Sequence, residues 1–122
     1  MSSDRMSAPV QGEIVIGKEI DSFSGAKATI YLEDVSLADA SAQVVARQTI
    51  PDISHQAGTE KRIPFNLPDY TPEERASYTV RVHLSRHDSQ DVRVGDCITM
   101  QSYPVLTGNN PDRTTIFVRE VK

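Results

Sequence analysis

Residues 77–84 read SYTVRVHL, and this stretch decides the fold class. Polar residues alternate there with the apolar residues Tyr78, Val80, Val82 and Leu84. Side chains of an extended strand point alternately to opposite faces, so a period of two puts one face on a core and the other in water. The stretch therefore predicts a half-buried β-strand.

The same alternation recurs through most of the chain. It is found in residues 13–17, 27–32, 62–67, 98–101 and 115–118. Short strands at such spacing favour a sandwich or a barrel. We therefore expect an all-β fold, an antiparallel β-sandwich of about seven strands. It would form one domain over residues 10–122, behind a disordered arm at residues 1–9.

Turn-forming residues separate the expected strands. They cluster at residues 22–25, 58–59, 88–90 and 108–111, of which the first suits a hairpin. Pro64 lies inside an alternating run, and proline has no N–H to donate to a neighbouring strand. We therefore expect its strand to lie at an edge of the sheet or to carry a bulge.

Two segments depart from the strand pattern. Residues 71–74 read TPEE, a capping box with proline at the first helical position, which predicts a short helical turn near 72–76. Residues 38–48 are rich in alanine and could be helical, whereas the β-branched residues of this segment and just after it favour a strand. We expect a strand that ends at Pro51.

Composition narrows the possible partners. The 122 residues carry a net charge of −4, and their basic residues are mostly scattered singly, which argues against binding to nucleic acid. The single cysteine, Cys97, cannot close an internal disulfide. Its neighbour Asp96 raises the pKa of the thiol, so we expect Cys97 to be packed and inert.

Targeting signals are also absent from the sequence. No apolar run approaches the roughly 20 residues that a membrane-spanning helix needs. Residues 1–9 contain neither an apolar signal core nor a cysteine that could carry a lipid. The sequence as written therefore predicts a cytoplasmic protein.

Metal sites are not supported by the residue spacing. His83 and His87 have the spacing of a helical zinc pair, but on a strand four residues span about 13 Å, so we interpret both as solvated. Asp88, Asp91 and Asp96 lack the ligand order and final glutamate of a calcium loop and are interpreted as turn residues. We expect no metal and no cofactor.

A polar cluster follows the expected strand that ends at Leu32. Asp34, Ser36 and Asp39 could bind a cation or a sugar hydroxyl, or could bond to the backbone of their own loop, which we favour. Nucleophilic catalysis needs a nucleophile, a base and an orienting group, and no local signature such as G-x-S-x-G is present.

The segment LEDVSLADA at residues 32–40 resembles the L-x-D-x-S-x-x-D hallmark of the YbaY/YscW family, which includes bacterial envelope lipoproteins and type III secretion pilotins. Three later segments look like family strands in matching order: IPFNL at 63–67, YTVRV at 78–82 and QSYPVLT at 101–107, which holds Tyr103 and Pro104. The resemblance covers roughly residues 10 to 121. It implies a compact β-sandwich, no catalysis, and an envelope location.

These observations favour a non-catalytic, chaperone-like module that binds a polypeptide, as the pilotins of the family escort a secretin subunit. An exposed strand edge can accept a partner strand, and Ile63, Pro64 and Phe65 are the candidate contacts. The alternative is a domain that binds a small ligand or an ion at the loop of residues 34–39. A second alternative is an enzyme that uses His83, His87 or Cys97.

Overall fold

The computed structural model describes residues 10–36, 42–86, 91–107 and 112–122. Within these ranges the chain forms eight strands: β1 (Gln11–Ile16), β2 (Phe23–Asp34), β3 (Gln43–His55), β4 (Lys61–Asn66), β5 (Tyr78–Ser85), β6 (Cys97–Thr99), β7 (Pro104–Val105) and β8 (Arg113–Glu120). The all-β class is confirmed. The expected disordered arm at 1–9 and the expected turns at 88–90 and 108–111 lie outside the described residues. A helix long and apolar enough to cross a membrane does not occur in the described part of the chain.

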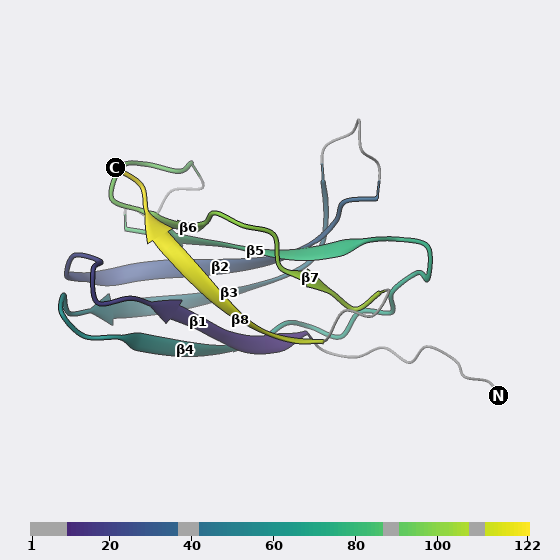
Figure 1. Ribbon diagram of the computed structural model, residues 1–122, viewed down its shortest axis with the longest axis horizontal. Helices are drawn as coiled ribbons and strands as arrows, with labels where there is room; N and C mark the ends of the chain where they lie inside the picture. Colours follow the sequence, from purple (N-terminus) through teal and green to yellow (C-terminus); the bar gives the residue numbers. More distant parts are fainter. Residues whose placement is uncertain (1–9, 37–41, 87–90, 108–111) are drawn as a thin grey trace.

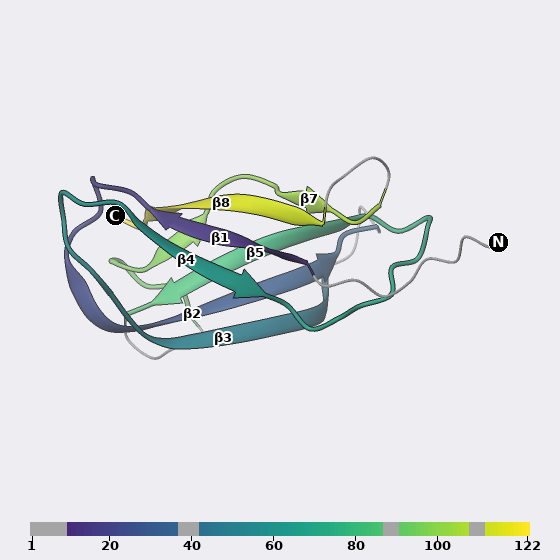
Figure 2. The same cartoon turned by 90° about the horizontal axis from the view of Figure 1, so that it is seen from below.

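Hydrogen bonds link the strands in the order β3-β2-β5-β6-β8-β1-β4, with β7 paired to β5 beside this path. The path folds into two layers, β3, β2 and β5 in one and β8, β1 and β4 in the other (Figures 1 and 2). Strand β8 connects them, because residues 113–117 pair with β1 whereas residues 118–120 pair with β6. The two end strands also meet, since the Asn66 N–H donates to Gln48 Oε1 at 2.9 Å. The sandwich is therefore a nearly closed barrel.

The pairing of β1 with β8 is parallel, which corrects the expectation of a purely antiparallel sandwich. The chain places its first and last strands side by side, and no local sequence signal reports such a distant pairing. Gly12 permits the close approach of the two strands. A Cβ at this position would lie 1.8 Å from the carbonyl oxygen of Thr114, a distance that no side chain tolerates.

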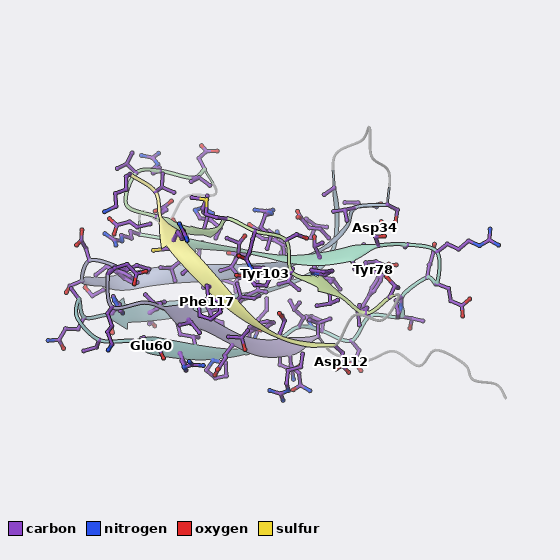
Figure 3. All side chains as sticks on the ribbon, viewed as in Figure 1. Asp34, Glu60, Tyr78, Tyr103, Asp112 and Phe117 are labelled. Atoms are coloured by element: carbon purple, nitrogen blue, oxygen red, sulfur yellow. The ribbon has the colours of Figure 1, made fainter. Side chains whose placement is uncertain are left out.

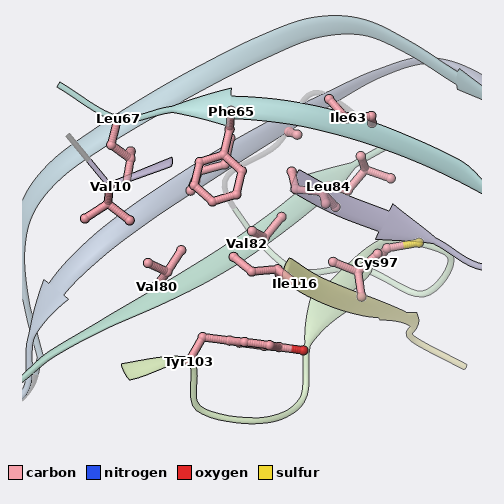
Figure 4. Packing of buried hydrophobic residues seen from close by; sticks show 14 of the residues in the cluster. Val10, Ile63, Phe65, Leu67, Val80, Val82, Leu84, Cys97, Tyr103 and Ile116 are labelled. Carbon is pink, nitrogen blue, oxygen red and sulfur yellow. The ribbon is translucent and has the colours of Figure 1, made fainter. Parts of the chain in front are cut away.

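The alternating residues of both layers meet in one apolar core (Figure 4). Phe65 of β4, Val82 of β5 and Ile116 of β8 are all buried within it. Burying one such side chain contributes roughly 1.5–3 kcal/mol, so this core holds the two layers together. The polar side chains that alternate with these residues form the two outer faces of the sandwich.

The predicted helical turn near 72–76 is wrong. The segment makes a single tight turn, in which the Ala76 N–H donates to the Glu73 carbonyl at 3.0 Å. The Glu73 N–H donates instead to the hydroxyl of Tyr78 at 3.0 Å. Because the chain enters β5 at Tyr78, too few residues remain for successive helical hydrogen bonds.

Two strand boundaries also differ from expectation. The strand preferred for residues 38–48 is present as β3, but it continues beyond Pro51 to His55. Pro51 and Asp52 sit where the register with β2 shifts, and Asp52 has φ 58°. An end strand tolerates a proline there, because one of its edges has no partner strand.

The turn expected at 22–25 lies earlier, where the Ile20 N–H donates to the Gly17 carbonyl at 3.2 Å. The turn at 58–59 is confirmed.

Candidate functional site

The hallmark residues at the end of β2 form a self-contained turn. Asp34 Oδ1 accepts hydrogen bonds from the backbone N–H and the hydroxyl of Ser36. The hydroxyl oxygen of Ser36 in turn accepts the Ser77 N–H at 3.0 Å. The hydrogen bonds from the Ser36 hydroxyl and N–H hold the pKa of Asp34 below its usual value. Leu32 is buried in the core, and Asp39 lies outside the described residues. The polar groups of this turn join the end of β2 to the segment before β5.

Tyr103 and Pro104 belong to a second structural joint. The hydroxyl of Tyr103 accepts the Phe117 N–H at 2.9 Å and lies 3.3 Å from the Phe117 carbonyl oxygen, to which it donates. This contact falls where β8 changes its partner from β1 to β6. Pro104 pairs with Thr79 at the start of β7. Both residues therefore hold the segment that follows β6 against β5 and β8. Figure 3 labels Tyr103 and Asp34, which belong to separate joints of the fold.

The predicted edge strand, β4, does lie at the end of the sheet path. Its Ile63 and Phe65 side chains face the core and are 7% and 4% exposed, whereas Pro64 is exposed. The Leu67 N–H donates to the Val10 carbonyl. Because backbone N–H and C=O groups point to alternate sides of a strand, those of Phe65 and Ile63 also point towards β1. Arg62, Pro64 and Asn66 consequently direct theirs at the open edge.

That open edge offers few backbone donors to a partner strand. Pro64 has no N–H, and the N–H of Asn66 is bonded to Gln48 of β3. Only the N–H of Arg62 is left on this side of β4. Such protection is common in natural edge strands. A partner would therefore contact the side chains on the outer face of this layer rather than the backbone of β4.

The outer face of the β8-β1-β4 layer carries a groove of about 490 Å³. Its apolar centre consists of Phe117 on β8 and Val15 on β1, which are paired neighbours in the parallel ladder. Val15 is 2% exposed although it points away from the core, whereas Phe117 is 54% exposed. Glu60, which precedes β4, also lines the groove, and Figure 3 labels both Phe117 and Glu60. The groove is completed by Gly17, Lys18, Glu19, Gln101, Val118 and Arg119.

Charged side chains flank this apolar centre. Arg62, which is opposite Val15 on β4, forms ion pairs with Glu13 and Glu60. Hydrogen bonds from Arg62 to Glu60 and then to Glu13 raise the pKa of the guanidinium further. Lys18 and Arg119 add positive charge, and Glu19 adds negative charge. An exposed aromatic ring with charges of both signs around it is typical of a polypeptide-binding surface.

The chain was compared with known families and solved structures. The sequence profile of the family described as type III secretion system lipoprotein chaperone (YscW) matches residues 6–118. The chain belongs to the YscW family. The solved structure of an alternative pilotin from the type II secretion system of Vibrio cholerae is similar, with a TM-score of 0.74 and 26% sequence identity. The similarity covers 96% of this chain and 99% of that chain. A search of curated proteins finds no match.

Family membership makes the chain a chaperone-like binding module, as the sequence predicts. Within this YscW-family fold, two of the residues suggested for catalysis, Cys97 and His83, are buried. Burial raises the pKa of the Cys97 thiol to about 11, and Cys97 has no exposed surface. A nucleophilic thiol needs a lowered pKa and access to solvent. Cys97 meets neither condition, as expected of a packed cysteine.

The interpretation of His83 as a solvated residue is wrong. His83 is 3% exposed, and its Nε2 donates to Asp96 Oδ2 at 2.9 Å. Asp96 is fully buried and also accepts the N–H groups of Arg86 and Arg93, each at 3.0 Å. The aspartate is therefore a turn residue, as predicted, and His83 is one of its donors. His87 lies outside the described residues, and no group of three possible metal ligands occurs within them.

The sequence reasoning missed the groove, although a signal was present. Alternation assigns Ile116 and Val118 to the core, which leaves the aromatic Phe117 on the polar side of the strand. Single exposed apolar residues are common, so Phe117 indicates a surface only together with the residues that line the groove beside it. The other lining residues come from distant segments, and only the register of β1 with β8 and β4 brings them together.

Proposed function

We propose that this YscW-family chain is a non-catalytic pilotin, which binds a secretin subunit of a secretion system and escorts it in the bacterial envelope. The observation that carries the proposal is the family match over residues 6–118. The similar fold of the Vibrio cholerae pilotin supports it. The envelope location follows from the lipoprotein family and replaces the cytoplasmic location expected from the sequence, which the comparisons do not support.

The partner polypeptide docks on the outer face of the β8-β1-β4 layer. Phe117 supplies the apolar anchor. Glu13 of β1 pairs with Thr115 of β8 on one side and with Pro64 of β4 on the other, so the exposed ring of Pro64 extends the surface across β1. Ile63 and Phe65 support this surface from the core side. We place the contact on side chains because the open edge of β4 has few backbone N–H groups left to pair with a partner strand. The surrounding ion pairs would orient the segment.

Phe117→Ser tests this proposal. Truncating an anchor that becomes buried on binding removes roughly 1.5–3 kcal/mol, which weakens binding by about tenfold to a hundredfold. Overlapping peptides that span the secretin subunit of the same host would be titrated against the purified chain, with affinity measured by fluorescence polarisation. Because Phe117 points outward, the variant should keep the melting temperature of the parent protein.

Val94→Ser is the matched control. Val94 is 71% exposed and lies outside the groove, so its loss should leave peptide affinity unchanged. If no secretin peptide binds, the proposed partner is wrong. If the two variants weaken binding equally, the partner is right and the docking surface is wrong.

A further inference from the structure

The outer face of the other layer, formed by β3, β2 and β5, carries a second hollow of about 230 Å³. The strand register brings its side chains together in rows. Thr29 of β2 lies between Thr49 of β3 and His83 of β5. In the next row, Tyr31 lies between Arg47 and Arg81. Lys27 and Ser85, which are paired, close the remaining side. The hollow is thus built by three adjacent strands.

Positive charge dominates the lining of this hollow. Lys27 and Arg47 are the basic side chains of this lining, and no carboxylate is among its lining residues, all of which lie in the described ranges. This contrasts with the net charge of −4 of the whole chain. Ion pairs between Arg47 and a carboxylate are not found among the described residues.

Two carboxylates that contact residues of β5 are already hydrogen-bonded there. Glu33 receives a bidentate contact from Arg81, with Nε–Oε1 at 3.2 Å and Nη2–Oε2 at 3.0 Å. The guanidinium of Arg81 also stacks on the Tyr31 ring, 4.1 Å from its centroid, and this holds Arg81 at the rim. Asp96 lies behind His83, where its oxygens accept three hydrogen bonds. The basic side chains that line the hollow are Lys27 and Arg47.

We infer that this hollow binds a phosphate group. Its lining adds the hydroxyls of Thr29, Tyr31, Thr49 and Ser85 to the cationic side chains. A tetrahedral oxyanion has three or four oxygens to satisfy, whereas a carboxylate has two, so a ring of donors on several sides favours the former. Arg47 provides the planar fork that pairs with two phosphate oxygens at once. The site is independent of polypeptide docking, because it lies on the opposite layer of the sandwich.

Two sources supply this chemistry, a free phosphate and the phosphate of a lipid headgroup. The first experiment uses sodium phosphate, with ionic strength held constant by sodium chloride, and follows backbone amide shifts by NMR. We expect saturable shifts at Thr29, Thr49 and their neighbours. Arg47→Gln should weaken phosphate binding by about tenfold, because a charge-assisted contact is lost. Arg75→Gln, which removes an equally exposed charge from a distant turn, should not change it.

The second experiment uses flotation of the protein with vesicles of phosphatidylcholine, with or without phosphatidic acid. Flotation that requires phosphatidic acid and is lost in Arg47→Gln identifies the lipid headgroup as a source. Phosphate binding without flotation identifies a soluble phosphate. The inference is overturned if sodium phosphate gives no saturable shifts, if Arg75→Gln weakens binding as much as Arg47→Gln, or if sodium acetate binds as tightly as phosphate.

Discussion

The buried carboxylate of Asp96 provides the sharpest test of how this fold is held together. It accepts hydrogen bonds from His83 Nε2, the Arg86 N–H and the Arg93 N–H, at 2.9, 3.0 and 3.0 Å. These contacts tie the end of β5 to the turn before β6. Asp96→Ala would leave all three donors without their partner. The His83 donor is buried and the two backbone donors are part-buried. Removing one partner of a buried pair costs about 3–5 kcal/mol, so we expect the free energy of unfolding to fall by roughly that amount.

Guanidinium unfolding followed by far-ultraviolet circular dichroism measures this loss, since the chain has no tryptophan. The exposed Asp69 supplies the control, because Asp69→Ala should change the free energy of unfolding by no more than about 0.5 kcal/mol. Most small domains are stable by only about 5–15 kcal/mol, so the predicted loss is easily resolved. A loss below about 1 kcal/mol for Asp96→Ala would refute the reasoning.

The pH dependence adds a second check on the same residue. Burial alone would raise the pKa of Asp96, but hydrogen bonds from His83, Arg86 and Arg93 outweigh it and hold the pKa below its usual value. A carboxyl whose pKa is lowered by folding stabilises the protein above its unfolded pKa of about 3.9 and loses this effect as the pH falls through the folded pKa. The stability advantage over Asp96→Asn should therefore shrink below about pH 4. A constant difference between pH 7 and pH 2 would contradict this account.

Three further variants or treatments test other joints of the structure. Gly12→Ala forces a Cβ against a backbone carbonyl of β8 and should lower the free energy of unfolding by about 1–3 kcal/mol. In the same chemical unfolding assay, Gly17→Ala should cost much less, because its Cβ displaces only a flexible glutamate carboxylate. Tyr103→Phe removes the hydroxyl that bonds to the Phe117 backbone and should lower the melting temperature, with a loss of about 1–3 kcal/mol. Cys97, buried with a raised pKa, should resist iodoacetamide at pH 7.5 in the folded protein and react readily in guanidinium, as mass spectrometry would show.

The sequence predicts the strands of this protein well because alternation reports burial directly. The run at 77–84 becomes β5, and its apolar residues face the core. Pro64 correctly marks an end strand, since a missing N–H is tolerated only where no neighbour needs it. The capping box at 71–74 misleads, because its local preference for a helix is weaker than the requirement that the chain enter β5 at Tyr78.

The surfaces could not be predicted in the same way. His83 occupies a polar position of β5, and alternation alone assigns it to solvent, but the loop that follows β5 returns Asp96 to cover it. The hollow around Arg47 depends on the registers of β2 with β3 and with β5, each of which joins residues far apart in sequence. A shift of one residue in either register would reverse the faces and abolish the site.

The hallmark residues of the family and the two proposed binding surfaces lie in different parts of the fold. Asp34 and Ser36 close a turn, and Tyr103 bridges the point where β8 changes partners, so these residues specify the architecture. Phe117 and Arg47 point away from the core on opposite layers, so we expect their replacement to leave the core packing unchanged. If the two proposed surfaces are right, a hallmark residue such as Asp34 reports the fold of this chain, whereas its binding properties depend on outward residues such as Phe117 and Arg47.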